Sequence, residues 1–184
     1  MLYQKESMQI KRVFAMGQKG IQAAVIKEIQ DEVDLQNSVE VIRKAFLTVA
    51  GDFNLTEKNA PTNPAFITLS KLQELKAKNT RFFGLFERGS QLGFIAIEKG
   101  PDLTYFLEKL AVIPPVRHRG FGAQLLNFAF EYVKKQGGRT ISIGIINEHA
   151  ILKKWYTRHG FQETGTKIFP HLPFSVCFME KSTI

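Results

Sequence analysis

The sequence predicts a single mixed α/β domain, and three observations indicate this class. Apolar runs of strand length, at residues 105–113 and 140–146, are interleaved with amphipathic helical stretches at residues 37–50 and 122–136. Turns that contain Gly or Pro separate these runs. The 184 residues are 44% hydrophobic and include 16 Phe, which is enough apolar mass for one substantial core.

The elements of the amino-terminal half follow in order. Residues 1–20 have no clear pattern and are expected to form an extension, so that residues 21–184 form the domain. A first strand is predicted at residues 23–29. The helix over residues 37–50 is expected to begin at Asn37, an N-cap residue type, with Glu40 three positions later. A long irregular stretch, residues 51–66, precedes a short helix near residues 68–78.

The carboxy-terminal half begins with a predicted hairpin, residues 81–87 and 91–98 around Arg88-Gly89-Ser90. The strand at residues 105–113 ends at Pro114-Pro115, because proline donates no hydrogen bond to a ladder. The helix over residues 122–136 stops at Gly137-Gly138. A strand at residues 140–146 and a final strand at residues 174–179 complete the pattern.

The turn between the strand at 105–113 and the next helix has the composition of a phosphate-binding turn. Gly120 and Gly122 lack the Cβ atoms that would hold a ligand away from the backbone. The first N–H groups of a helix have no intrahelical partner, and the helix dipole adds about 0.3–1 kcal/mol in favour of an anion there. The amides of residues 119–123 and a guanidinium of Arg117 or Arg119 are therefore expected to bind a diphosphate. An ordinary connection with surface arginines is the alternative.

The chain resembles the GNAT superfamily of acyl-CoA-dependent N-acetyltransferases. Arg117-x-x-Gly120-x-Gly122 matches the pyrophosphate motif of that family, and two flanking stretches are similar to it, Leu107-Glu-Lys-Leu-Ala-Val-Ile-Pro114 and Trp155-Tyr156-Thr-Arg-His-Gly160-Phe161. The resemblance covers roughly residues 80–180, and its nearest likeness is an uncharacterised bacterial branch. It implies a mostly antiparallel central sheet of six to seven strands, with a splay between the fourth and fifth strands and about four flanking helices.

The resemblance also implies how acetyl-CoA lies. The pantetheine arm enters the splay and pairs with the backbone of the fourth strand, so Leu110, Ala111 and Val112 are expected to contact it. No metal is expected, because none of the four His has metal-ligand spacing with another His or with Cys177. The full set of cofactor-binding residues then comprises Leu110, Ala111, Val112, Arg117, His118, Arg119, Gly120, Phe121, Gly122, Ala123 and Asn147.

Two residues are candidates for proton transfer, which an amine acceptor and a thiolate leaving group both require. Tyr156 stands where the family has a tyrosine directed at the thioester sulfur, and its alternative role is core packing. Glu108 interrupts an apolar strand and, by the two-residue period, is expected to share a face with Leu110 and Val112. It is a candidate general base, with a structural pairing to Lys109 as the alternative.

The acceptor side is expected to include Phe46, Phe53 and the 51–66 loop, because the superfamily varies its acceptor specificity there. An ordinary surface loop is the alternative for that stretch. His171 lies in the connection between the last two strands and is a candidate substrate contact. His159 is expected to interact with a helix dipole, and Cys177 to be a small buried hydrophobe.

The formal net charge is +8, with no block of five or six basic residues, so a nucleic-acid partner is not expected. The single Cys and the lack of a long apolar segment favour a cytoplasmic protein without a membrane partner. The sequence leaves the oligomeric state open, and a homodimer is one of the alternatives. The resemblance thus implies a transferase that moves the acetyl group of acetyl-CoA to a primary amine by direct attack in a ternary complex, with a small-molecule amine or peptide as the substrate. The alternatives are a protein or peptide N-acetyltransferase and an acyl-CoA-binding sensor without turnover.

Overall fold

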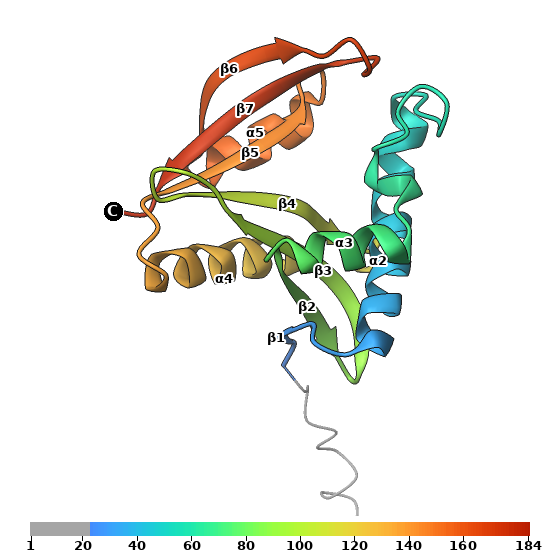
Figure 1. Ribbon diagram of the computed structural model, residues 1–184, viewed down its shortest axis with the longest axis vertical. Coiled ribbons are helices and arrows are strands. Elements are labelled where there is room, and N and C mark those ends of the chain that lie inside the picture. The colour runs from blue at the N-terminus through green and yellow to red at the C-terminus, as the bar shows by residue number, and fades with distance from the viewer. Residues whose placement is uncertain (1–22) are drawn as a thin grey trace, which may run out of the picture.

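The computed structural model describes residues 23–184, and the predicted extension at residues 1–20 lies outside them. Seven strands form one sheet in the order β1-β2-β3-β4-β5-β7-β6, and helices lie on both of its faces (Figure 1). All pairings are antiparallel except β4 with β5, which are parallel. The strands are β1 (Val25–Glu28), β2 (Arg81–Glu87), β3 (Ser90–Lys99), β4 (Thr104–Val112), β5 (Thr140–Ile146), β6 (Gln162–Ile168) and β7 (Ser175–Ser182).

Two hydrophobic cores define the faces of the sheet. The α4 face packs against α4 (Phe121–Lys135) and α5 (Ala150–Arg158), and its core contains Leu125, Ile143 and Tyr156. The α2 face packs against α2 (Glu32–Asp52) and α3 (Leu69–Ala77), which cover β1 to β4. β2 alternates between the cores with the two-residue period of a strand: Phe83 and Leu85 belong to the first core, and Phe82 and Phe86 to the second.

Helix α2 begins at Asp31 and not at Asn37, so the predicted N-cap was wrong. The Asp31 carboxylate accepts a hydrogen bond of 2.8 Å from the backbone N–H of Asp34. Glu32 and Asp34 place negative charge in the first turn, where the helix dipole favours it. Leu35 is buried and extends the apolar face by one turn before Asn37, which is why the helix starts earlier than the sequence pattern indicated.

The other elements for which the sequence predicted a range lie close to it, whereas α5 and β6 had no predicted range. Thr68 caps α3 by accepting from the backbone N–H of Lys71. The region between α2 and α3 contains a single 3-10 turn, Pro64–Phe66, and another 3-10 turn, Pro114–Val116, follows β4. The predicted splay is present, since β4 pairs with β5 only from Thr104 to Phe106. Figure 1 shows the two strands diverging beyond that point.

A β-bulge in β4 lies where the strands separate. Glu108 pairs with Ala96 and Ala111 pairs with Phe94, so Lys109 and Leu110 together oppose one residue, Ile95. Lys109 has a φ of 54°, which is uncommon for a residue other than glycine. The extra residue shifts the alternation of side chains by one position, and it bends the strand at the start of the splay.

Candidate active site

The turn before α4 has a row of backbone donors without acceptors. Gly120 is the N-cap of α4 and has a φ of 83°, and His118 also has a positive φ, 64°. Within residues 23–184 the amides of Val116 and Arg117 donate to backbone carbonyls and Gln124 donates to Gly120, but no amide of residues 118–123 has an acceptor. No acidic side chain stands in the first turn. This arrangement suits an anion.

The two glycines of the turn differ in what a side chain would meet. A Cβ on Gly120 would meet no atom within 4 Å, but the positive φ of 83° disfavours any other residue. A Cβ on Gly122 would lie 3.5 Å from the Trp155 ring, which is ordinary contact. The backbone conformation therefore requires glycine at Gly120. At Gly122 the protein has room for a Cβ, and glycine matters there only because it leaves space for a ligand.

The side chain of Arg117 is directed at α2 and away from the unpartnered amides. Its guanidinium donates to Val112 O at 3.2 Å, to Thr48 Oγ1 at 3.0 Å and to Ala45 O at 2.7 Å. Burial lowers the pKa of Arg117, and the carboxylate of Asp52 partly offsets this effect. Arg117 thus connects the end of β4 to the last two turns of α2.

The side chain of Arg119 is also engaged away from the row of amides. Arg119 forms a two-point ion pair with Glu87, with N–O distances of 3.1 and 2.7 Å, and its guanidinium lies 4.6 Å from the ring centre of Phe121. The side chain of His118 is exposed. The main chain of the turn, and not its arginine side chains, faces outward as a set of donors.

Glu108 lies on the α2 face, contrary to the expectation that it shares a face with Leu110 and Val112. Its cross-strand partner Ala96 belongs to the core of the α2 face, whereas Leu110 and Val112 pack against the core of the α4 face. The bulge at Lys109 reverses the alternation between them, so the two-residue period does not hold across it. The Glu108 carboxylate pairs with the ammonium of Lys109 at 2.5 Å.

Tyr156 lies two turns into α5 and is buried, with 6% of its surface exposed. Its ring packs edge-on against Phe161 and Trp155, at centroid distances of 5.3 and 4.9 Å. Burial raises the pKa of the Tyr156 hydroxyl well above its ordinary value. The phenol therefore keeps its proton at neutral pH and is a hydrogen-bond donor.

Asn147 follows β5 directly and is held in place by two contacts. Its backbone N–H donates to Ser175 O at 2.9 Å, and its side-chain Oδ1 accepts from Lys153 Nζ at 2.7 Å. The same Lys153 Nζ lies 3.1 Å from Glu163 Oε2. Of the Asn147 side chain, the amide group remains as a donor for a ligand.

The acceptor-side candidates fall into two groups. Phe46 and Phe53 pack against a small core of Ala50, Leu55, Ala60 and Ala65, together with Ile146 at the end of β5 and Phe174 before β7. His171 is exposed, and its ring lies 5.8 Å from that of Phe169. A cavity of about 400 Å³ lies beside the end of α2, and neither Phe46 nor Phe53 lines it. Its walls are formed by Leu47, Ala50, Gly51, Asn54, Leu55, Thr56 and Phe66.

His149 has a role that the sequence pattern did not indicate. It is the N-cap of α5, and its Nδ1 accepts from the backbone N–H of Leu152 at 3.4 Å. Its ring lies 5.4 Å from that of Phe53. Burial lowers the pKa of His149, and Asp52 partly offsets this effect. Histidine is not among the preferred N-cap residues, so no sequence signal marked His149 as the cap.

Two other side chains, His159 and Cys177, are placed as expected. The His159 ring contacts Trp155 O at 2.8 Å at the end of α5, and Cys177 is buried with a pKa that burial raises. Within residues 23–184 no group of His, Cys, Asp and Glu side chains is arranged to hold a metal ion. In the same residues, no helix combines the length and apolar character that a membrane span needs.

Within residues 23–184, the sheet opens between two parallel strands beside a helix start whose amides have no acceptor, which is the arrangement that the GNAT resemblance implies. The chain belongs to the acetyltransferase (GNAT) family, whose model matches residues 49–161. Membership in this family indicates acyltransferase activity.

A curated relative and several solved structures are similar to the chain. An uncharacterised N-acetyltransferase of Methanocaldococcus jannaschii is 34% identical over 99 residues, which are 48% of this chain and 42% of the relative, so the match spans less than half of that protein. The ribosomal-protein-S18-alanine N-acetyltransferase of Escherichia coli has a TM-score of 0.69 at 16% identity, over 88% of this chain and 94% of that one. The PaiA N-acetyltransferase of Thermoplasma acidophilum, solved in complex with coenzyme A, has a TM-score of 0.68 at 20% identity, over 87% and 99%.

Proposed function

We propose that this protein transfers the acetyl group of acetyl-CoA directly to a primary amine, in a complex that holds both substrates. One observation carries the proposal. The unpartnered amides of residues 118–123 adjoin the part of β4 that no longer pairs with β5. A turn that can bind a diphosphate is therefore continuous with an unpaired strand edge. A ligand with a diphosphate at one end and an amide-bearing arm at the other matches both.

The binding roles follow from this continuity. The amides of residues 118–123 bind the diphosphate, and the backbone of Leu110, Ala111 and Val112 binds the amides of the arm. Asn147, at the end of β5, offers its side-chain amide to the arm from the opposite side of the splay. Arg117 supports the site indirectly, because its three hydrogen bonds fix the end of β4.

The chemical roles fall to two residues on opposite faces of the sheet. Bound acetyl-CoA supplies an activated thioester. Glu108, on the α2 face, takes a proton from the incoming ammonium, directly or through a water, and frees the lone pair of the nitrogen. As the new C–N bond forms and the C–S bond breaks, the Tyr156 hydroxyl hydrogen-bonds to the departing sulfur and supplies its proton. The proton that the nitrogen loses on becoming an amide restores the Tyr156 hydroxyl, directly or through a water, and Glu108 releases its proton to solvent. Acetylated amine and coenzyme A result.

The acceptor approaches from the α2 face under this proposal. Glu108 lies on that face, and the small core that contains Phe53 and Phe174 borders it at the ends of β5 and β7. We assign Phe46 and Phe53 to the wall of the acceptor site, and His171, in the connection from β6 to β7, to its rim.

A coenzyme A release assay with product mass spectrometry tests the proposal, over a panel of small amines, amino acids and peptides. We expect release that depends on the amine, together with a product heavier by one acetyl group. Calorimetry with acetyl-CoA and with acetyl-pantetheine, which lacks the diphosphate, provides the second measurement. Tight binding of acetyl-CoA without release for any acceptor would favour the sensor alternative, and equal affinity for the two thioesters would overturn the role of the turn.

A further inference from the structure

Within residues 23–184, no helix covers the α2 face of β5, β7 and β6, except where Ile146 at the end of β5 packs against the small core around Phe53. In residues 23–184, α2 and α3 cover β1 to β4, whereas α5 lies on the other side of β5 and β7 (Figure 1). The core of the α2 face contains no residue of β5, β6 or β7. An acceptor that reaches the splay from this face would therefore lie along these strands.

The strand register places one row of side chains across that face. Glu98 on β3 pairs with Phe106 on β4, Phe106 pairs with Ser142 on β5, and Ser142 pairs with Glu180 on β7. Paired residues point to the same face of a sheet, and Phe106 is two residues before Glu108, which lies on the α2 face. The row thus has a carboxylate at each end and an aromatic ring within it.

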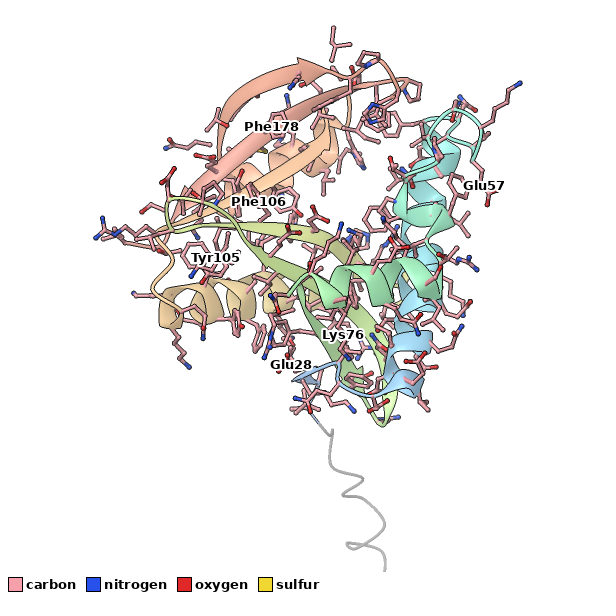
Figure 2. The ribbon with its side chains drawn as sticks, viewed as in Figure 1. Glu28, Glu57, Lys76, Tyr105, Phe106 and Phe178 are labelled. Atoms are coloured by element: carbon pink, nitrogen blue, oxygen red, sulfur yellow. The ribbon has the colours of Figure 1, made fainter. Side chains whose placement is uncertain are left out.

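The next row leads to the splay. Glu108 stands on β4, and on the other side of the opening Gly144 on β5 pairs with Phe178 on β7. A Cβ on Gly144 would lie 3.7 Å from the Phe178 ring, so that ring covers the place where β5 has no side chain. Phe106 is 37% exposed, and Figure 2 labels both rings, which belong to the strands on either side of β5. Aromatic surface and small residues therefore separate Glu108 from Glu180.

Three carboxylates lie on the α2 face of β3, β4 and β7, namely Glu98, Glu108 and Glu180, although the chain as a whole is basic. Among residues 23–184, Glu180 takes part in no ion pair, and Glu98 has one long hydrogen bond of 3.5 Å, from Thr80 Oγ1. Glu108 pairs with Lys109. The one lysine of β6 on this face, Lys167, has its ammonium 5.0 Å from the ring centre of Phe169. A chain with a net charge of +8 thus presents carboxylates and aromatic faces beside the splay.

We propose that the acceptor is an aliphatic diamine, bound with its reacting amine near Glu108 and its second ammonium at Glu180. The inference rests on the proposed function and names its acceptor class. Glu108 and Glu180 lie two strand spacings apart across the sheet and one side-chain row apart along it, so their backbones are at least about 12 Å apart, and the two glutamate side chains and the diamine together span that gap. The methylene chain lies over the aromatic surface, and the second ammonium is attracted by the faces of Phe106 and Phe178 as well as by Glu180.

The two amines have different fates in the reaction. The reacting amine loses a proton to Glu108 and gains the acetyl group, whereas the second amine stays protonated and serves only for binding. Because Glu180 contacts the end of the acceptor that does not react, it determines specificity and is not a catalytic residue. Its removal is expected to change KM for a diamine far more than kcat.

The test compares putrescine with butylamine, which has the same carbon chain and one amine fewer, in the coenzyme A release assay. We expect kcat/KM for putrescine to exceed that for butylamine at least tenfold at equal concentrations of the neutral reacting amine. Glu180→Gln should remove most of this advantage through KM, and should leave butylamine unchanged. The matched control is Glu131→Gln, which removes the same charge from the exposed face of α4 and should change neither.

Equal kcat/KM for the two amines in the wild-type protein, or an equal loss for both in Glu180→Gln, would overturn the diamine proposal and leave the transferase function standing. Calorimetry with putrescine in the presence of coenzyme A separates the two claims further. Binding that weakens at least fivefold in Glu180→Gln, without turnover of any amine, would support the acceptor site and contradict the transferase function. Putrescine that fails to bind and to react, while another amine reacts, would overturn the diamine proposal alone.

Discussion

The ring of Phe53, at the end of α2, lies 5.4 Å from the ring of His149, at the start of α5. One turn or two earlier in α2, Thr48 and Ala45 accept hydrogen bonds from Arg117, which follows β4. The last turns of α2 therefore contact residues that follow β4 and β5, the two strands that separate. Asp52 lies close enough to influence the pKa of Arg117 and that of His149.

Removal of the Arg117 side chain is expected to destabilise the fold. Arg117→Ala deletes three hydrogen bonds and leaves Ala45 O without this donor, at a cost of about 2–4 kcal/mol in the free energy of unfolding. Urea denaturation measures it. Arg139→Ala, at an exposed position, is the control and should cost less than about 0.5 kcal/mol. Equal losses in the two variants would contradict the structural role of Arg117.

Gly120→Ala is expected to weaken the binding of coenzyme A. A side chain at a φ of 83° costs about 1–2 kcal/mol, and relief of that strain rotates the amides of the turn, so the Kd measured by calorimetry should rise about five- to thirtyfold. Gly137→Ala is the matched control, because Gly137 has a φ of 76° at the other end of α4 and equally open space. It should lower stability without a change in Kd. A parallel rise in both variants would assign the effect to general destabilisation.

Tyr156→Phe is expected to lower kcat by about 10²-fold or more under the proposed mechanism, because the departing sulfur loses its proton donor. The ring remains, so its contacts with Phe161 and Trp155 and the affinity for acetyl-CoA should not change. Steady-state kinetics and calorimetry on the same preparation make the comparison. Wild-type turnover in the variant would leave Tyr156 as a packing residue only.

The His149 cap makes stability depend on pH. The folded protein lowers the pKa of His149 from its ordinary 6.5, because the site is buried and Nδ1 must stay unprotonated to accept from Leu152. The unfolded chain then binds the proton more readily, so this contribution is present above about pH 6.5 and is lost as the pH falls. Urea denaturation between about pH 7.5 and 5.5 should show a decrease in the free energy of unfolding.

His149→Asn is the companion variant for that measurement. Asparagine caps helices well and does not titrate, so the variant should lose less stability over the same pH range. The other histidines are common to both proteins, so the difference between the two curves isolates His149. Curves with the same slope would show that the cap does not couple to pH.

Much of the fold could be predicted because strong local signals coincide with the elements. The alternation of Ile141, Ile143 and Ile145 predicted β5 with its bounds, and the glycines at both ends of α4 marked that helix. The GNAT resemblance on residues 107–122 supplied the sheet and its splay, and the match of the family model confirmed the membership. These features depend on residues that are near one another in the chain.

The parts that were missed depend on contacts between distant residues or on rare backbone conformations. Nothing in the sequence of β4 marks Lys109 as a bulge, because no glycine or asparagine stands there to accommodate its positive φ. The partners of Arg117 lie 69 and 72 residues earlier in the chain, so its structural role has no local signal. Glu108 was predicted on the wrong face of the sheet because the bulge at Lys109 has no sequence signal.

The bulge in β4 has a consequence for how such an opening can arise or be lost. A single inserted amino acid lets Leu107 and Leu110 both face the α4 side while the backbone between them bends out of register with its neighbour. Excision of Lys109 would restore strict alternation and favour a continuous ladder with β5 in place of the gap. The entrance for the thioester would then be closed by main-chain pairing, although every side chain assigned to chemistry would still be present.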